Sequence, residues 1–498
     1  MRRLAPHIGV AGTVALLAMV VGCGGPAAGV APVGSAATCN ATTTPVAPTT
    51  AAPPPATVLP ALWGRHWFPA LAAAQDGRAR ATVAVVGDSV GEGLYASDLA
   101  GTSWVELIRS DLVQRAGDGG SGFQGMARSQ TFLEGLPARA SEHYLGTPGN
   151  AWTQTGTWRT PTWPYGPGYG ALVASTPGST VTIPFTGTDL AIDYADRGSP
   201  WTYAVDGGQE RRTVPADTDA PSTVRVAGLA AGPHTVRITS QGADGPWLGG
   251  IEGADDRGVR LDNYSIAGLE SGAWNNADPW RSGQLVGGVR NPADLVIYTL
   301  GGNDVLKAVR DVTAAPVAGN PGVPGLGWQT IDAGRLVTGP GIPAGTTVVA
   351  VDPETSTATL SHAPTQSAAA VDLTVTAQDV VSTWRRNVEG YLNGLQRSGD
   401  GLELAPDIVF VWAPADATPQ VESLYGQLKD QARAVAASVG AAFVDVQAAT
   451  GQPWSDWCEA GRAGNADDPA AAGADGAHPS DAGHRYIADL VLRTITPQ

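Results

Sequence analysis

Apolar, mostly β-branched runs recur along the chain, and helical patterns separate several of them. Buried strands are predicted over 83–86, 258–268, 293–304, 407–415 and 441–447. Helices are predicted over 102–116, 380–396, 422–439 and 480–495. In the third of these, apolar residues recur at helical spacing, namely Leu424, Leu428, Ala432 and Val435. Strands that alternate with helices predict an α/β fold, in which helices cover both faces of a parallel sheet.

Two stretches interrupt this alternation. Residues 135–255 hold short alternating runs such as "STVTIPF" and "DLAIDYA", and they predict an antiparallel β-sandwich inserted into the α/β domain. Residues 314–377 hold the turns "GPGIPAG" and "DPETS", and they predict a second, small β insertion. We therefore expect the α/β domain in three pieces, over 61–134, 256–313 and 378–498.

The N-terminus has the features of a bacterial export signal. Arg2 and Arg3 precede an apolar stretch over 8–22 that is short for a membrane span. The stretch ends in "VVGC", which resembles a lipobox with Cys23 as the lipidated residue. We expect a lipoprotein signal peptide over 1–22 and a protein anchored by lipid at the outer face of the bacterial membrane. The alternative is a plain secretory signal and a secreted protein with a buried Cys23.

Residues 23–60 are rich in Ala, Pro, Thr and Gly and carry almost no charge, so they predict an extended linker. Cys39 lies in this linker and Cys458 near the C-terminus, and an oxidising compartment would allow the two to pair. The formal net charge is −16, and no basic stripe is visible, which argues against a nucleic-acid partner.

Polar residues follow the predicted strands in an ordered series. The first strand is followed by Gly87-Asp88-Ser89, and later runs end at Gly268 and at Asn303. Ser89 has two interpretations: a nucleophile at the end of a strand, or part of a capped helix start with Asp88 or Ser89 as N-cap. The last motif is "DGAHPSDAGH", which contains Asp475 and His478.

In content and order this series resembles the SGNH (GDSL-type) hydrolase family, whose four blocks supply a serine, a glycine, an asparagine and a histidine. The resemblance covers roughly 80–130 and 255–498 and implies a flavodoxin-like parallel sheet flanked by helices. It also implies that Ser89 is the nucleophile and His478 its base, with Asp475 as the orienting carboxylate. The oxyanion donors would be the backbone N–H groups of Ser89 and Gly268 and the side-chain amide of Asn303.

A second Asp-x-x-His pair, Asp481 and His484, follows the first. Ser480 resembles the N-cap of the last predicted helix, which places His484 inside that helix and leaves His478 on the preceding loop. We therefore expect His478, and not His484, to be the base. The remaining histidines, which include His66, His143, His234 and His362, are not spaced like metal ligands. We therefore expect no metal and no cofactor.

The predicted sandwich contains a cluster of aromatic residues in a loop-rich stretch, with Trp152, Trp158 and Trp163 among them. Aromatic faces of this kind would stack on sugar rings, or else they pack the sandwich and its seam with the α/β domain. Some carbohydrate esterases of the resembled family also carry a β-sandwich.

These features predict a serine esterase that hydrolyses acyl esters, acetyl esters among them, on a cell-envelope or extracellular polysaccharide. One alternative is a lipase-like esterase on lipid esters, although no long apolar lid segment is visible. The other is a non-catalytic envelope binding or adhesion lipoprotein with a hydrolase-like core, although residues of all four motif blocks are present.

Overall fold

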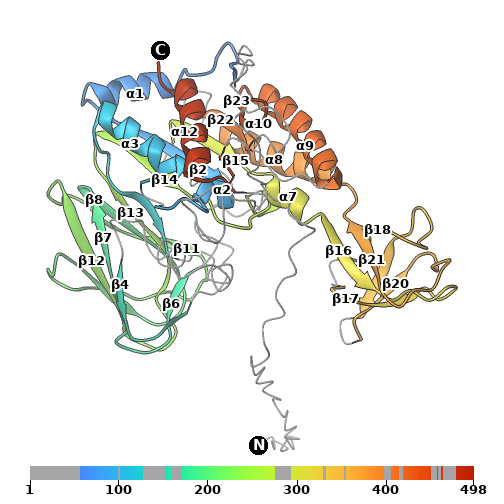
Figure 1. Ribbon diagram of the computed structural model, residues 1–498. Coiled ribbons are helices and arrows are strands. Elements are labelled where there is room, and N and C mark those ends of the chain that lie inside the picture. The colour runs from blue at the N-terminus through green and yellow to red at the C-terminus, as the bar shows by residue number, and fades with distance from the viewer. Residues whose placement is uncertain are drawn as a thin grey trace, which may run out of the picture.

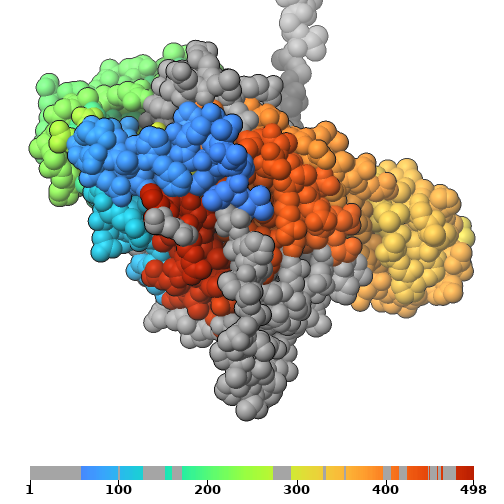
Figure 2. Space-filling model, turned by 90° about the horizontal axis from the view of Figure 1, so that it is seen from above, coloured from blue at the N-terminus to red at the C-terminus, as the bar shows by residue number. Residues whose placement is uncertain are grey.

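The computed structural model describes residues 57–98, 101–126, 152–159, 171–274, 293–328, 332–352, 355–397, 405–413, 419–449, 457, 461–463 and 478–497. The predictions for Cys23, Cys39, Trp163, Cys458 and Asp475 lie outside these residues. A helical α/β body lies between two β units, which occupy opposite ends of the molecule in both views (Figures 1 and 2). No helix in the described ranges is long and apolar enough to cross a membrane.

A six-stranded sheet forms the centre of the α/β body. In spatial order its strands are β1 (Thr57–Val58), β23 (Ala442–Asp445), β22 (Asp407–Trp412), β15 (Leu295–Thr299), β2 (Arg80–Gly87) and β14 (Gly258–Asn263). All neighbours pair in parallel except β1, which is antiparallel to β23. Numbered in chain order, the five parallel strands run 2-1-3-4-5, which is the order of doubly wound sheets of the flavodoxin type. The predicted mixed α/β architecture with a parallel sheet is confirmed.

Helices cover both faces of this sheet (Figure 1). One face packs against α1 (Trp67–Gln75), α3 (Trp104–Ala116) and α12 (Asp481–Ile495), and the other against α8 (Val380–Arg397) and α9 (Pro419–Ser438). The side chains of β2 alternate between the two apolar clusters, with Val83 and Val85 in one and Ala84 and Val86 in the other. A strand buried on both faces is a continuous apolar run, which explains the sequence pattern of 83–86.

Two antiparallel sheets follow the first strand and helices of the α/β body. One has the order β10 (Arg211–Thr213), β9 (Trp201–Val205), β12 (Pro233–Ser240), β7 (Thr180–Thr186), β4 (Thr153–Thr155). The other has the order β11 (Pro221–Val226), β8 (Asp189–Ala195), β13 (Trp247–Ala254), β6 (Leu172–Ala174), β5 (Trp158–Arg159), and β3 (Gly122–Gly125) pairs with β13. Inward side chains of both sheets, such as Ile183 of β7 and Ile192 of β8, form one buried cluster.

The strand β13 was not predicted from the sequence. Its residues, "WLGGIEGA", include three glycines and are all buried, so they show no alternation of apolar and polar positions. A Cβ at Gly250 would lie 2.3 Å from the Phe123 ring, and one at Gly253 would lie 2.4 Å from the Thr186 carbonyl oxygen. Glycine therefore permits the close approach of β3 and β7 to this strand. Because β3 pairs with β13, this sheet includes residues before 135.

The second β unit is one six-stranded antiparallel sheet with the order β18 (Leu336–Thr338), β21 (Val371–Thr376), β16 (Val309–Ala314), β17 (Gly322–Leu326), β20 (Thr357–Leu360), β19 (Val348–Asp352). It has its own apolar cluster, which includes Val312, Val323 and Leu373. The unit lies between the short helix α7 (Gly302–Leu306) and α8. Its first and last strands pair, so the chain leaves and re-enters the α/β body at neighbouring positions.

Candidate active site

Ser89 lies directly beyond the carboxyl end of β2. Asp88 is the N-cap of the short helix α2 (Ser89–Glu92), and its Oδ1 accepts a hydrogen bond of 3.0 Å from the Val90 backbone N–H. Ser89 is the first residue of that helix. The cap fixes the turn after the strand, so the capped-helix interpretation and a functional position for Ser89 are compatible.

His478 meets Ser89 from the other end of the chain. Its Nε2 lies 2.8 Å from Ser89 Oγ, which is hydrogen-bond distance. Ser480 caps α12 by accepting from the Gly483 backbone N–H, so His478 lies just before the helix and His484 within it, as predicted. His484 is fully buried and does not line the cavity around Ser89. The structure therefore brings His478, and not His484, to the serine.

Asn303 and Gly268 come from two further strand ends. Asn303 lies in α7 after β15, and its Nδ2 donates to the Leu269 carbonyl oxygen over 3.1 Å, which leaves its second amide hydrogen for another acceptor. Gly268 has a φ of +79°, and a Cβ there would meet no heavy atom of the described chain within 4 Å. This left-handed backbone conformation, which favours glycine, explains why a glycine lies at position 268.

A cavity of about 240 Å³ collects several of these groups at the point between β2 and β15 where the strand order reverses. It is lined by Ser89, His478 and Asn303, together with Asp88, Thr299, Gly301 and the apolar side chains of Leu306, Val411, Trp412 and Tyr425. Gly268 is not among the residues that line it. In doubly wound sheets, ligands bind outside the carboxyl ends of the strands at such a reversal.

Two carboxylates at this site have raised pKa values: Asp88 lines the cavity, and Asp304 follows the cavity residue Asn303 in α7. Burial raises the pKa of Asp88 to about 6, against the opposing effects of the Val90 hydrogen bond and of nearby His478. Burial likewise raises the pKa of Asp304 to about 6, against the hydrogen bonds that Ser271 donates to it. Titratable groups with shifted pKa values cluster at functional sites, which agrees with the position of these two carboxyls at the cavity.

The segment around Gly268 is held by two residues to which the sequence analysis gave no role. Glu92 Oε2 accepts from the Ala267 backbone N–H over 2.6 Å. Asp304 accepts from the backbone N–H and the hydroxyl of Ser271 over 2.9 and 2.6 Å. The position of Asp304 next to Asn303 in the sequence could have indicated its role. Nothing in the sequence indicated a role for Glu92.

Trp152 and Trp158, the two described tryptophans of the predicted sugar-binding stretch, do not line the cavity. Trp152 is 9% exposed and belongs to the apolar cluster between the two sheets, and Trp158 packs against that cluster. Packing therefore describes Trp152, which is buried in the apolar cluster, whereas Trp158 is only partly buried. The sugar-stacking interpretation of this stretch stays a prediction.

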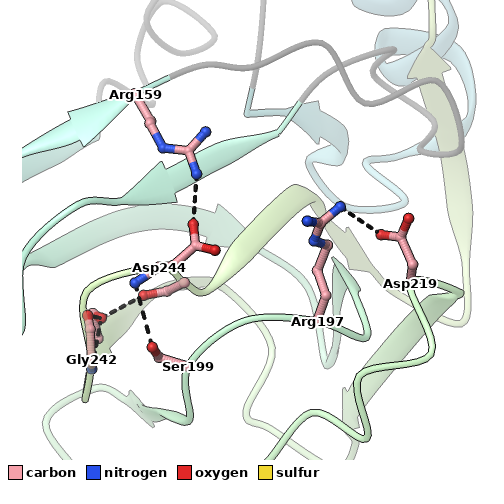
Figure 3. Close-up of polar contacts among 8 residues, drawn as sticks. Arg159, Arg197, Ser199, Asp219, Gly242 and Asp244 are labelled. Atoms are coloured by element: carbon pink, nitrogen blue, oxygen red, sulfur yellow. Dashed lines mark hydrogen bonds and ion pairs between the residues drawn. The ribbon is translucent and has the colours of Figure 1, made fainter. Parts of the chain in front are cut away.

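A third tryptophan of the same sheets, Trp247, is also covered. The guanidinium groups of Arg159 and Arg197 lie over its ring at 4.9 and 4.2 Å from the centroid. Each arginine is fixed by an ion pair, Arg159 to Asp244 over 2.6 Å and Arg197 to Asp219 over 3.0 Å (Figure 3). Trp247 is only 7% exposed, so it offers no free aromatic face for a sugar.

Comparisons with known proteins point to carbohydrate esterases. Residues 169–243 match the family model of the carbohydrate esterase 2 N-terminal region. The structure resembles that of a peptidoglycan O-acetylesterase, with a TM-score of 0.51, 16% identity, and coverage of 86% of this chain and 95% of that chain.

More distant matches are carbohydrate esterase family 2 enzymes. One is from Corynascus thermopiles (Myceliophthora fergusii), with a TM-score of 0.25, 12% identity, and coverage of 68% of this chain and 98% of that chain. Another is from Clostridium thermocellum, with a TM-score of 0.25, 12% identity, and coverage of 70% and 98%. No curated protein matches the sequence. The chain thus shares its fold with a peptidoglycan O-acetylesterase, and a stretch of its antiparallel sheets matches the N-terminal region of carbohydrate esterase 2.

Proposed function

We propose that the protein is a serine esterase of the SGNH type that removes acyl groups, acetyl groups in particular, from a cell-envelope or extracellular polysaccharide. The observation that carries the proposal is the 2.8 Å contact between Ser89 Oγ and His478 Nε2, in one cavity with the Asn303 amide. A serine hydroxyl needs an adjacent base to act as a nucleophile at neutral pH, and a neutral imidazole at this distance is such a base.

In the first half-reaction, Ser89 Oγ attacks the ester carbonyl carbon, and its proton passes to His478 Nε2. The negative charge that develops on the carbonyl oxygen is stabilised by the Asn303 Nδ2–H and, on the family resemblance alone, by the backbone N–H groups of Ser89 and Gly268. The bond between the carbonyl carbon and the sugar oxygen then breaks. His478 returns the proton to the sugar oxygen, and the acyl group remains on Ser89.

In the second half-reaction, water attacks the acyl-Ser89 carbonyl and gives a proton to His478. The bond to Ser89 Oγ breaks, the proton returns to Ser89, and the carboxylic acid leaves. Asp475 is proposed, on the family resemblance alone, to orient the imidazole and to stabilise its charged form.

The size of the cavity and the comparisons support a short acyl group on a sugar. Pockets for drug-sized ligands occupy about 300–1,000 Å³, whereas this cavity has about 240 Å³. A lipase-like esterase would need a longer apolar channel. The match of residues 169–243 to a carbohydrate esterase region and the fold of a peptidoglycan O-acetylesterase both favour an acylated carbohydrate as substrate.

A screen of ester substrates tests the proposal. The full chain is incubated with O-acetylated peptidoglycan, acetylated xylan, and p-nitrophenyl esters of increasing chain length, and the Ser89→Ala variant is the control. We expect acetyl esters to be cleaved faster than long-chain esters, and a fluorophosphonate probe to label the wild type but not Ser89→Ala. A preference for long acyl chains would favour the lipase alternative. A complete lack of labelling and of turnover would favour the non-catalytic binding or adhesion protein.

A further inference from the structure

The second Asp-x-x-His pair of the sequence, Asp481 and His484, lies in the first turn of α12, immediately after His478. Neither residue lines the cavity at Ser89. Both instead form hydrogen bonds with the chain segment that follows the Ser89 helix. Their partners lie in residues 93–98 and 101–104 of this segment. The pair therefore connects the element that supplies His478 to the segment that follows Ser89.

The Asp481 carboxylate is fastened to this segment by three donors. Its Oδ1 accepts from the Ser97 backbone N–H over 2.8 Å and from the Thr102 hydroxyl over 2.7 Å. Its Oδ2 accepts from the Ser97 hydroxyl. Charge-assisted hydrogen bonds of this kind are roughly twice as strong as neutral ones, so three of them fix the segment firmly to α12.

His484 makes the second connection. Its Nε2 donates to the Leu94 carbonyl oxygen over 3.1 Å, and its Nδ1 accepts from the Trp104 backbone N–H over 3.4 Å. Burial lowers the pKa of His484 to about 4, so the ring is neutral at neutral pH. A neutral imidazole has one donor and one acceptor, and both are used by these backbone groups.

The segment carries Tyr95 between the two connections. Tyr95 has a φ of +66°, a left-handed conformation that is rare for a bulky residue and persists only where the surroundings hold it. The His484 bond at Leu94 and the Asp481 bonds at Ser97 lie on either side of it. The Tyr95 ring lies against the imidazole of His478, with 5.1 Å between the ring centroids and 57° between the planes.

We propose that Asp481 and His484 are positioning residues, which hold Tyr95 against the His478 ring and thereby keep His478 Nε2 at Ser89 Oγ. The proposal rests on the proposed function of the Ser89–His478 pair. A displacement of about 1 Å in a reacting group can cost about a hundredfold in rate. The hydrogen bonds between α12 and the segment after Ser89 are therefore expected to affect the rate of the chemical step. Such support is expected to affect kcat and to leave substrate binding nearly unchanged.

The test compares kcat, KM and thermal stability in variants of the connection. With p-nitrophenyl acetate, Asp481→Ala is expected to lower kcat about tenfold or more and to change KM by less than about twofold. Asp481→Asn retains one acceptor oxygen and should fall between Asp481→Ala and the wild type. Tyr95→Leu should lower kcat in the same way, whereas Tyr95→Phe keeps the ring and should stay near the wild type.

If the helix variants do not fold, the same bonds can be removed from the other side. The double variant Ser97→Ala, Thr102→Val deletes the two hydroxyl donors without changing α12, and it should reproduce the loss of kcat. His484→Phe fills the buried volume but removes both ring hydrogen bonds, and it should lower kcat with little effect on KM.

The matched control is Asp407→Ala. Asp407 is the first residue of β22, at the end of the sheet opposite Ser89, and its carboxylate accepts from the backbone N–H groups of Gly64, His66 and Trp67 over 3.0, 2.9 and 2.8 Å. Its loss should lower Tm and leave kcat near the wild type. If Asp481→Ala lowers Tm as Asp407→Ala does and also keeps its kcat, the positioning role is overturned. A wild type that neither turns over esters nor reacts with fluorophosphonate would overturn the proposed function instead.

Discussion

Ser89 Oγ and His478 Nε2 lie 2.8 Å apart, although 389 positions separate the two residues in the chain. The contact exists because Ser89 begins the helix α2 just beyond the carboxyl end of β2, and α12 begins just after His478. Two β units intervene in the sequence, yet the parallel sheet brings the first and last pieces of the α/β body together.

The first prediction concerns this pair. Ser89→Ala and His478→Ala should each reduce kcat by a factor on the order of 10⁴ or more, because nucleophile and base act as one unit. The double variant should be little slower than either single variant. Steady-state kinetics on p-nitrophenyl acetate measures all three. Independent losses that multiply in the double variant would contradict a shared role.

The second prediction concerns Asn303. Asn303→Ala should lower kcat by about 10²–10³ with a smaller change in KM, because the amide donor binds the oxyanion most strongly in the transition state. The same substitution also removes the hydrogen bond to Leu269. Lys307→Met is the control, since Lys307 Nζ donates to the Gly268 carbonyl oxygen over 2.6 Å from an exposed position. Equal losses in both variants would assign the effect to loop anchoring.

The third prediction concerns Asp88 and pH. The folded protein raises the pKa of this carboxyl from 3.8 to about 6 by burial, so between these values the folded state keeps a proton that the unfolded chain has released. Stability from this group is therefore lost as pH rises through that window, by about 3 kcal/mol. Asp88→Asn cannot titrate and should lack this decline. Urea unfolding at a series of pH values measures the difference, and parallel curves for the two proteins would contradict the prediction.

The fourth prediction concerns the second β unit. Ala377 N donates to the Ala308 carbonyl oxygen over 2.7 Å, so the two ends of the unit lie side by side. Replacing residues 309–376 with a short Gly/Ser linker should leave a folded protein with nearly wild-type kcat on p-nitrophenyl acetate, because the unit has its own apolar cluster. A folded but inactive deletion variant would show that the unit contributes to the site.

The fifth prediction concerns the proposed lipid anchor at "VVGC". Cys23→Ala should release the protein from the membrane fraction into the medium, because the residue that would carry the lipid is lost. Fractionation of expressing cells followed by detection of the protein measures this. A Cys23→Ala protein that stays membrane-bound after signal cleavage would contradict the lipobox interpretation.

The sequence by itself determined the class of fold and the motifs of the candidate site. The buried strands of the parallel sheet are apolar runs because both of their faces are covered, so β2, β15 and β22 are visible as local patterns. Caps are local as well, which is why Ser480 could be assigned as the N-cap of α12 before the structure was known.

Only the tertiary structure decided the features that depend on close approach between distant segments. The glycine-rich strand β13 and the short helix α1, which contains Pro69, lack a clear period and are stabilised by packing against other elements. The sequence did not show that Trp152 is buried in the apolar cluster between the antiparallel sheets and that Trp158 packs partly buried against this cluster. The partners of Asp481 and His484 in the segment after Ser89 could not be predicted either, because hydrogen bonds between residues hundreds of positions apart leave no local pattern in the sequence.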